Sequence, residues 1–382
     1  MGAVFYTAMA QVEVVETQEA VREAVHRCLQ QLEGRRAGVV LLYASVDLEH
    51  PAILEAIQAQ WPGVPLIGGT TDGEFSSTGG YTEDSFTLVI LGSESVSFRV
   101  GMLDLGQPLA PQCREALAAP GPSPSLGILL ADGLSYAAED ALVALQDAFG
   151  AELPWLGGTT ADRWKFSGNL QFFGSRVLCG AAVYLLLCGS FRYGFGVDTG
   201  WKPVGPTGVV TRSIKNVVHE IDGRPAMAFY RRLMGEGALP SVDTPTAVYD
   251  PCDSYLFLRT SILPLDPSLS SICYSAGVPE GSRVRVTLVD RDSIIEAVRR
   301  SVCRAKGMFG GGDPPDLALC FSCAARRAIL GSRTADEVGT ACATLGSAVP
   351  VAGFYAYGEI APLEPGTPSL FQNEAFVSLL LG

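Results

Sequence analysis

The sequence repeats one segment pattern three times, and this repeat constrains the fold more than any other feature. The segment Pro65–Glu74 (PLIGGTTDGE) returns in altered form as residues 154–162 (PWLGGTTAD) and 350–359 (PVAGFYAYGE). Before each copy stand an apolar run, at residues 38–44, 126–131 and 317–322, and a helical pattern, at 51–60, 136–149 and 334–345. After each copy comes a second apolar run, at 86–91, 181–187 and 375–381. The predicted unit is therefore strand, helix, Pro-x-x-Gly turn, strand.

This unit predicts the fold class. An uninterrupted apolar run is typical of a strand that is covered on both faces, and a helix between two parallel strands crosses back over the sheet. We therefore expect an α/β protein with repeated βαβ-like units in mixed sheets. Residues 192–250 interrupt the repeats, and Gly235–Pro240 (GEGALP) has the composition of a linker. This predicts two interlocked domains, at 37–235 and 236–382, after an N-terminal segment, 1–36.

Composition excludes several classes of protein. With 382 residues, of which 48% are hydrophobic and 18% charged, the chain can bury a large core. Its net charge is -13 and only four of its 27 basic residues are lysines, which disfavours nucleic acids and anionic membrane surfaces as partners. No apolar run reaches the ~18 residues of a membrane span, and the N-terminus has no basic region typical of a signal peptide. We expect a cytoplasmic protein without membrane insertion.

Catalytic and metal signatures are weak. The three histidines are far apart in the sequence, and the single C-x-x-C, Cys320–Cys323, lies in an apolar run without a second pair. No G-x-S-x-G elbow occurs, and the triple glycine at 310–312 precedes a strand-like run instead of the helix that a phosphate cradle needs. We therefore expect neither an enzyme nor a metal site.

Several motifs together resemble the FIST family. Pro65–Glu74, followed by Glu83–Ser85 and an apolar strand, is similar to the N-terminal FIST domain, as is Ile221–Ala226 (IDGRPA). The second half resembles the C-terminal FIST domain at residues 258–260 (LRT), 277–281 (GVPEG), 321–326 (FSCAAR) and 353–359 (GFYAYGE). The resemblance covers nearly the whole chain beyond about residue 36, in the order in which the family has these motifs.

The resemblance implies a sensory, signal-transduction module that binds a small polar ligand, with amino acids proposed for the family. Bacterial members often stand beside output domains, but none fits in this sequence, so we expect a stand-alone sensor that signals to a separate output protein. Some family members are described as haem-binding nitric-oxide sensors. Here His219 is the best-placed axial ligand for such a haem, whereas otherwise we expect no cofactor. A ligand-free adaptor is the remaining alternative.

Candidate ligand-binding residues cluster in the third copy and its surroundings. Where the buried run 317–322 ends, Cys323 reaches the carboxyl edge of the sheet, which is where open α/β sheets bind ligands. We expect a cleft between the two halves of the chain, lined by Arg259, Cys323, Arg326, Tyr355, Tyr357 and Glu359. Arg259 stands among apolar residues, so it is either a structural ion pair or the receptor of a ligand carboxylate. Cys323 is either a buried apolar thiol or one whose pKa Arg326 lowers.

The first copy offers a second group of candidates, namely Gly68, Gly69, Asp72 and Glu74. Glycines at this position either make a tight turn or allow a ligand to approach the backbone. A carboxylate in an apolar cleft needs a cation, so Glu74 and Glu359 either receive the ammonium group of a ligand or hydrogen-bond to their own local turn. The sequence leaves both alternatives open.

Overall fold

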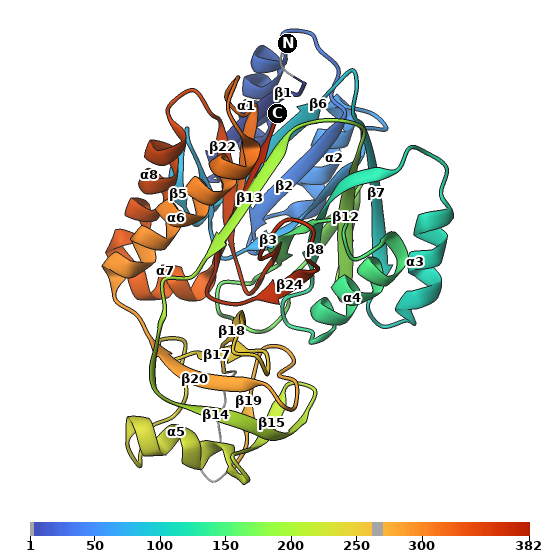
Figure 1. The fold of residues 1–382 in the computed structure, drawn as a ribbon. Helices are drawn as coiled ribbons and strands as arrows, with labels where there is room; N and C mark the ends of the chain where they lie inside the picture. Colours follow the sequence, from blue (N-terminus) through green and yellow to red (C-terminus); the bar gives the residue numbers. More distant parts are fainter. Residues whose placement is uncertain (1–3, 262–269) are drawn as a thin grey trace.

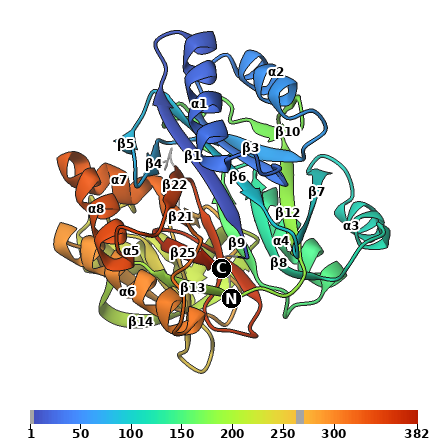
Figure 2. The same cartoon turned by 90° about the horizontal axis from the view of Figure 1, so that it is seen from above.

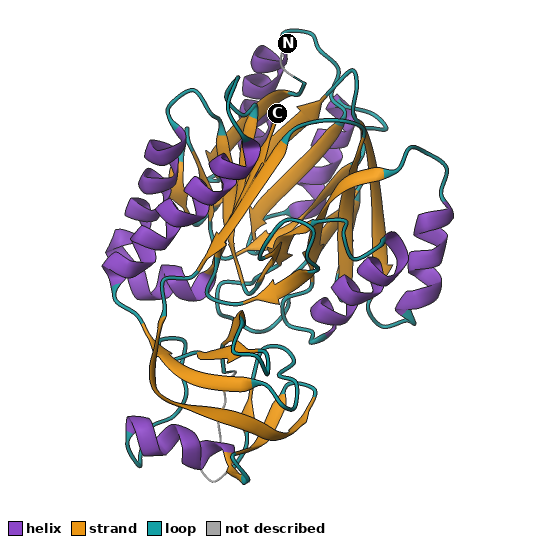
Figure 3. Ribbon diagram, viewed as in Figure 1, coloured by secondary structure: helices purple, strands orange, loops and turns teal. Residues whose placement is uncertain are grey.

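The computed structural model describes residues 4–261 and 270–382. Within these residues the strands form three six-stranded sheets and one seven-stranded sheet (Figure 1). The three six-stranded sheets and their helices make up the large body of the molecule, and a smaller antiparallel body lies beside it (Figure 3). The predicted α/β class with mixed sheets is confirmed.

The large body consists of three units that share one order of elements, with the short helix α7 added in the third. The first contains β1 (Tyr6–Glu13), α1 (Thr17–Leu32), β2 (Val39–Ser45), α2 (His50–Gln60), β3 (Leu66–Thr71), β4 (Glu74–Ser76), β5 (Gly80–Thr82) and β6 (Ser85–Gly92). The second contains β7 (Ser97–Asp104), α3 (Leu109–Ala118), β8 (Pro124–Ala131), α4 (Ala137–Phe149), β9 (Trp155–Thr159), β10 (Gln171–Phe173), β11 (Arg176–Leu178) and β12 (Ala181–Cys188). The third contains β13 (Tyr193–Asp198), α6 (Arg291–Phe309), β21 (Leu317–Cys323), α7 (Ala324–Leu330), α8 (Thr334–Leu345), β22 (Val351–Ala356), β23 (Glu359–Pro362), β24 (Ser369–Gln372) and β25 (Phe376–Leu381).

Each six-stranded sheet contains four strands of one unit in the same spatial order, and its remaining two strands are a hairpin from another unit. The four strands follow the orders β1-β6-β2-β3, β7-β12-β8-β9 and β13-β25-β21-β22. The third and fourth strands of each series are parallel. The hairpin β4–β5 of the first unit continues the third sheet, β10–β11 of the second continues the first, and β23–β24 of the third continues the second. The three units are therefore interlocked in a closed ring.

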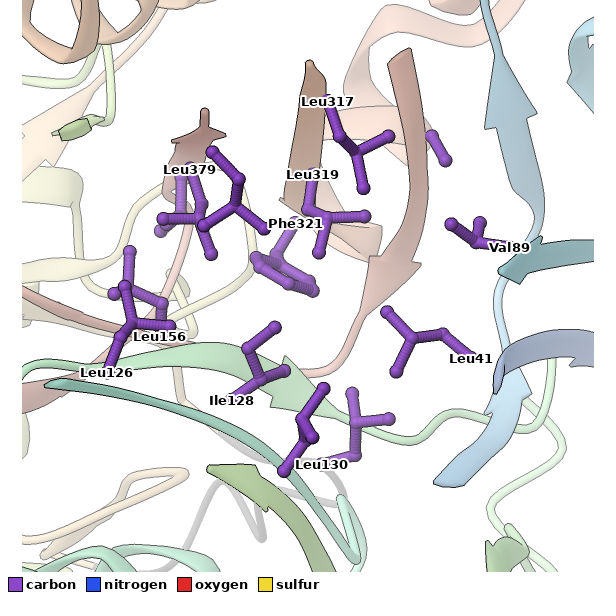
Figure 4. Close-up of a cluster of buried hydrophobic side chains, with 14 of the residues drawn as sticks. Leu41, Val89, Leu126, Ile128, Leu130, Leu156, Leu317, Leu319, Phe321 and Leu379 are labelled. Atoms are coloured by element: carbon purple, nitrogen blue, oxygen red, sulfur yellow. The ribbon is translucent and has the colours of Figure 1, made fainter. Parts of the chain in front are cut away.

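The three sheets share one central core. Alternate residues of each strand point to opposite faces, so Leu41, Ile128 and Leu319 meet at the centre of the ring with their neighbours from all three sheets (Figure 4). The other faces of the sheets are covered from outside by helices, as the view from above shows (Figure 2). Both faces of the central strands are thus buried, which explains why their sequences are apolar throughout.

The smaller body is inserted in the third unit, between β13 and α6. It contains β14 (Lys202–Ile214), β15 (Val217–Ile221), β16 (Arg224–Pro225), α5 (Ala226–Met234), β17 (Thr246–Tyr249), β18 (Tyr255–Arg259), β19 (Ile272–Cys273) and β20 (Arg283–Leu288). Its own apolar core packs β14, β15, β17 and β20 against α5. The expected boundary after residue 235 lies within this body, directly after α5. Residues 6–32 of the expected N-terminal segment form β1 and α1 of the first unit.

The predicted Pro-x-x-Gly turn is wrong, because the glycines lie inside strands. Gly68, Gly157 and Gly353 occupy equivalent positions of β3, β9 and β22. A Cβ atom at these positions would stand 2.0, 2.0 and 2.2 Å from a carbonyl oxygen of the neighbouring parallel strand. The first glycine of each motif is therefore required for close strand pairing.

Candidate functional site

A cavity of about 200 Å³ lies where the large body meets the inserted body. The large body contributes residues at the carboxyl ends of β8, β9 and β21, the edge at which α/β sheets bind ligands, together with the loops 164–166 and 371–374. The inserted body contributes residues near β17, β18 and β19. The lining residues are Asp132, Gly133, Leu134, Ser135, Tyr136, Ala138, Glu139, Thr159, Trp164, Phe166, Val242, Thr260, Ser261, Ser275, Ala276, Cys323, Ala324, Ala325, Tyr357, Phe371, Asn373 and Glu374.

The lining is acidic and aromatic. Three carboxyl groups line the cavity, those of Asp132, Glu139 and Glu374, whereas none of the described lining residues is a lysine, arginine or histidine. Five aromatic side chains complete the wall, from Tyr136, Trp164, Phe166, Tyr357 and Phe371. Such a site can hold an apolar group and accept hydrogen bonds, but it offers no cation to an anionic ligand.

Glu374 is the lining carboxyl group whose hydrogen bonds are incomplete. It stands between β24 and β25 in the left-handed backbone region, with φ of 61°, and its side chain is fully buried. Its Oε1 accepts a hydrogen bond of 2.5 Å from the hydroxyl of Thr260 in the inserted body. Its Oε2 has no hydrogen-bond partner. Burial raises the pKa of this carboxyl to about 8, since transfer out of water disfavours the charged form.

Cys323 lies at the end of β21 and is 4% exposed. Burial raises the pKa of its thiol well above the ordinary value, and the nearby carboxyls of Glu359 and Glu374 raise it further. Of the two alternatives derived from the sequence, the geometry matches the buried thiol, because Arg326 points away toward Glu337. Cys323 therefore contributes to the wall of the cavity as a neutral group.

Arg326 and Tyr355 belong to a buried network behind the cavity. The guanidinium of Arg326 pairs with the carboxylate of Glu337 at 2.7 Å, and both side chains are fully buried. The same guanidinium donates hydrogen bonds to the carbonyl oxygens of Thr199 (2.6 Å) and Ile294 (3.0 Å), close to where the chain enters and leaves the inserted body. The hydroxyl of Tyr355 donates to Glu337 at 2.7 Å. Neither Arg326 nor Tyr355 lines the cavity.

Arg259 joins the inserted body to the large body. Its Nη2 donates to Oε1 of Glu139 at 2.9 Å, and its Nη1 donates to the carbonyl oxygen of Phe371 at 2.8 Å. Its guanidinium also stands 3.5 Å from the ring centre of Phe257. Burial lowers the pKa of Arg259 to about 10 while Glu139 opposes that shift. The arginine thus forms an ion pair whose partner lines the cavity, although Arg259 itself does not.

Tyr357 lines the cavity, whereas Glu359 does not. The hydroxyl of Tyr357 donates to Oδ1 of Asp162 at 2.7 Å and accepts from the backbone of Trp164 at 2.6 Å. Glu359 is fully buried outside the lining, and its Oε2 accepts a hydrogen bond of 3.0 Å from the backbone of Ala375. Burial raises the pKa of Glu359 well above its ordinary value.

The candidates from the first copy lie outside the cavity lining. Gly68 is explained by strand pairing, and a Cβ atom on Gly69 would lie 2.2 Å from Thr160 Cγ2. Asp72 pairs with Arg327 at 2.8 Å, and burial raises its pKa to about 6 despite that pairing. Glu74 accepts hydrogen bonds from the hydroxyls of Thr71 and Ser85, and burial raises its pKa to about 8. His219, the candidate haem ligand, lies on β15 of the inserted body and is also outside the lining.

The structure therefore brings Cys323 and Tyr357 together in one cavity, with residues that the sequence analysis missed. The repeat could have predicted Asp132. Leu129 and Cys320 pair with the equivalent glycines of β9 and β22, and Asp132 follows Leu129 by three residues, as Cys323 follows Cys320. Glu374 had no such signal, because its hydrogen-bond partner Thr260 lies 114 residues earlier, in the inserted body.

The aromatic side of the cavity is carried by a strained loop. Arg163, Trp164 and Phe166 all adopt left-handed backbone conformations, with φ of 58°, 60° and 48°. Such conformations cost on the order of 1 kcal/mol or more each in residues other than glycine and cluster at binding sites. The indole Nε1 of Trp164 donates to Asp72 at 3.0 Å, and the ring of Phe166 stacks on Tyr357 with centroids 5.6 Å apart. The loop thus presents ordered rings to the cavity.

The chain matches the FIST N domain over residues 38–224 and the FIST C domain over residues 226–362. It therefore belongs to the FIST family, which confirms the resemblance seen in its motifs. The border between the two matches falls inside the inserted body, at the start of α5. None of the described helices combines the length and hydrophobicity needed to cross a bilayer.

The proteins to which this chain is similar do not establish an activity for it. An uncharacterized protein of Mycobacterium tuberculosis (strain H37Rv) is 30% identical over 210 residues, which cover 51% of this chain and 53% of that protein. An uncharacterized protein of Methanocaldococcus jannaschii is 30% identical over 92 residues, 24% of this chain and 18% of that protein. The chain thus spans about half the length of the mycobacterial relative. A crystal structure of cyanuric acid hydrolase from A. caulinodans aligns over 98% of this chain and 99% of its own, with a TM-score of 0.34 and 9% identity. A TM-score of 0.34 does not establish a shared fold.

Proposed function

We propose that this protein is a sensor that binds a small molecule in the cavity between its two bodies and does not convert it chemically. The observation that carries the proposal is that both bodies build the wall. The large body provides Cys323, Tyr357 and Glu374, whereas the inserted body provides Val242, Thr260, Ser261, Ser275 and Ala276. A ligand held there contacts both bodies at once.

Binding without turnover suits the groups in the wall. Nucleophilic catalysis by a cysteine needs the thiolate and a nearby base. The pKa of Cys323 is raised, so its thiol stays protonated near neutral pH. Among the described lining residues there is no histidine or lysine that would remove its proton. The polar groups of the wall are suited to hydrogen bonding and orientation.

Transmission follows from the way the inserted body is attached. Two chain crossings, at residues 199–201 and 289–290, join it to the large body. Arg326 binds the backbone of Thr199 in the first crossing and that of Ile294 in the first turn of α6, just beyond the second. A ligand that contacts both bodies stabilises one relative arrangement of them over others, which is the general basis of a ligand-driven shift. We propose that a separate output protein recognises this arrangement.

The test is a thermal-shift screen of small metabolites, followed by calorimetry. A ligand at 100 times its Kd stabilises the folded protein by about 2.7 kcal/mol. Ala276→Leu places a larger side chain in the cavity and should abolish the response, whereas Ala118→Leu, on the exposed face of α3, should retain it. Ligand should also slow amide exchange at both crossings. A hit that survives Ala276→Leu would refute this site. No hit, together with a stable protein partner of the ligand-free chain, would favour the adaptor.

A further inference from the structure

The described lining of the cavity has a carboxyl oxygen without a hydrogen-bond partner and contains no lysine, arginine or histidine. The two arginines that the sequence predicts for this cleft are both occupied. Arg326 is bound to Glu337 and to backbone carbonyl oxygens, and Arg259 is bound to Glu139. A ligand carboxylate would be buried here without a cation, and an unpaired buried charge is strongly unfavourable.

The three lining carboxyls differ in what they can still accept. Asp132 accepts hydrogen bonds from the backbone of Leu134 (2.7 Å), Ser135 (3.0 Å) and Gly180 (3.1 Å) and from the amide of Asn169 (3.1 Å). Glu139 accepts from Arg259 (2.9 Å) and from the backbone of Gly277 (2.8 Å). Glu374 accepts only from Thr260, and its Oε2 is buried without a partner. Among the carboxyl groups of the described lining, Glu374 is therefore the one with an oxygen that lacks a donor, while the hydroxyl of Ser135 is a second lining group without a partner.

The aromatic wall suits the same kind of ligand. Trp164, Phe166 and Tyr357 stand within contact of one another, with ring centroids 5.6 to 5.9 Å apart. Aromatic faces attract organic cations and also bury apolar carbon. A cavity of about 200 Å³ has room for a small organic molecule.

We propose that the ligand of this cavity is a small primary amine with an apolar body, whose ammonium group binds Glu374 and whose body packs on Trp164, Phe166 and Tyr357. This inference rests on the proposed function and specifies its ligand class. It excludes free amino acids and carboxylic acids of the same size, since their carboxylates find no cation in the wall.

The titration of Glu374 gives the binding a pH signature. The charged or titratable groups that face it are Arg326, whose charge favours the carboxylate, and Asp243, Glu359 and Cys323, which do not. Because burial raises the pKa of Glu374 to about 8, the free carboxyl is largely protonated at pH 7, and an ammonium ion that binds it displaces the proton. Affinity for the amine should therefore rise as pH increases from about 6 to 8.

The experiment compares 2-phenylethylamine, phenylalanine and 3-phenylpropionate, which share one ring and carry different charged groups, together with butylamine and butyrate as a smaller pair. Calorimetry on the full chain should show the amine of each set binding at least about tenfold more tightly than its acid or amino acid. In buffers of different ionisation enthalpy, binding of the amine at pH 7 should release a fraction of a proton. Glu374→Gln should weaken amine binding at least about tenfold and remove the proton release. Glu364→Gln, on the exposed β23–β24 loop, should change neither.

Selectivity of the unmodified protein is independent of whether the Glu374→Gln variant folds. Tighter binding of the acid or of phenylalanine would overturn the inference and leave the proposed function in place. Absence of binding for all five probes would also overturn it, and the metabolite screen would then decide on the proposed function separately. Amine binding that Glu374→Gln leaves unchanged in a folded variant would overturn the role of Glu374.

Discussion

Removing one partner of the buried ion pair between Arg326 and Glu337 should strongly destabilise the folded chain. Arg326→Met removes both contacts to the carboxylate and the hydrogen bonds to Thr199 and Ile294. Glu337 then keeps only the hydroxyls of Ser322 (3.1 Å) and Tyr355 (2.7 Å) as donors. Breaking a buried pair by removing one partner costs about 3–5 kcal/mol, because the other charge is left uncompensated.

The magnitude can be measured as a double-mutant cycle. With an unfolding entropy of about 2.1 cal/mol/K per residue, a loss of about 4 kcal/mol lowers the Tm of a 382-residue chain by roughly 5 °C. Urea unfolding followed by far-UV circular dichroism gives the free energy itself. Glu337→Met should be destabilised by a similar amount, since it leaves the Arg326 charge without its carboxylate.

The double variant Arg326→Met/Glu337→Met decides whether this reasoning holds. It removes both charges, so it should be less destabilised than the sum of the single variants by at least about 2 kcal/mol. Some loss remains, because backbone carbonyl groups that Arg326 satisfied are left without a donor. Additive losses in the double variant would show that the cost is one of packing and not of charge, and would refute the argument.

Three further predictions concern the rest of the fold. A fragment of residues 1–235 should aggregate, because it lacks β21, β22 and β25 and so exposes the central core; a soluble fragment that melts cooperatively would contradict the shared core. Gly353→Ala should lower the free energy of unfolding by about 1–3 kcal/mol, since its Cβ would meet Cys320 O at 2.2 Å and the Phe75 ring at 2.4 Å. Gly339→Ala, on the exposed face of α8, should instead raise it by up to about 1 kcal/mol. Thermal melts compare the two variants. As pH rises from 5 to 8, the Glu74→Gln variant should lose less stability than the unmodified protein. The raised pKa of about 8 makes native Glu74 keep a proton that the unfolded chain releases from about pH 4.5 upward, so the stability of the unmodified protein falls with pH. Equal pH slopes in urea unfolding would speak against a buried neutral Glu74.

Features determined by local pattern could be predicted from the sequence. The predicted helix 334–345 coincides with α8, and the apolar runs at 38–44, 126–131 and 317–322 became β2, β8 and β21 with shifts of at most two residues. The sequence shows the repeated motif but indicates a turn at its glycines, because it does not show the neighbouring carbonyl group that excludes a side chain. The strand β1 and helix α1 were missed because the repeat was defined only from the second strand of each unit.

The candidate site could likewise be predicted only where local pattern determines it. Cys323 could be placed in the wall from its position after a buried strand, as could Tyr357 from its place in the third copy. Arg259 and Arg326 could be predicted to need partners, but not to find them in Glu139 and Glu337, which lie 120 and 11 residues away. Glu374 and the loop of Trp164 and Phe166 became parts of the site only through contacts between distant segments, which a single sequence does not report.

The exchange of hairpins around the ring also sets an order of events during synthesis. The first sheet cannot acquire all its strands until β10–β11 have been translated, and the second must wait for β23–β24, residues 359–372. Until then the edge of β9 is an unpaired strand open to other chains, and most native contacts join segments far apart along the polypeptide. Such a topology folds slowly and exposes aggregation-prone intermediates. We expect the nascent chain to depend on chaperones until its third unit leaves the ribosome, which makes yield from rapid overexpression sensitive to the rate of translation.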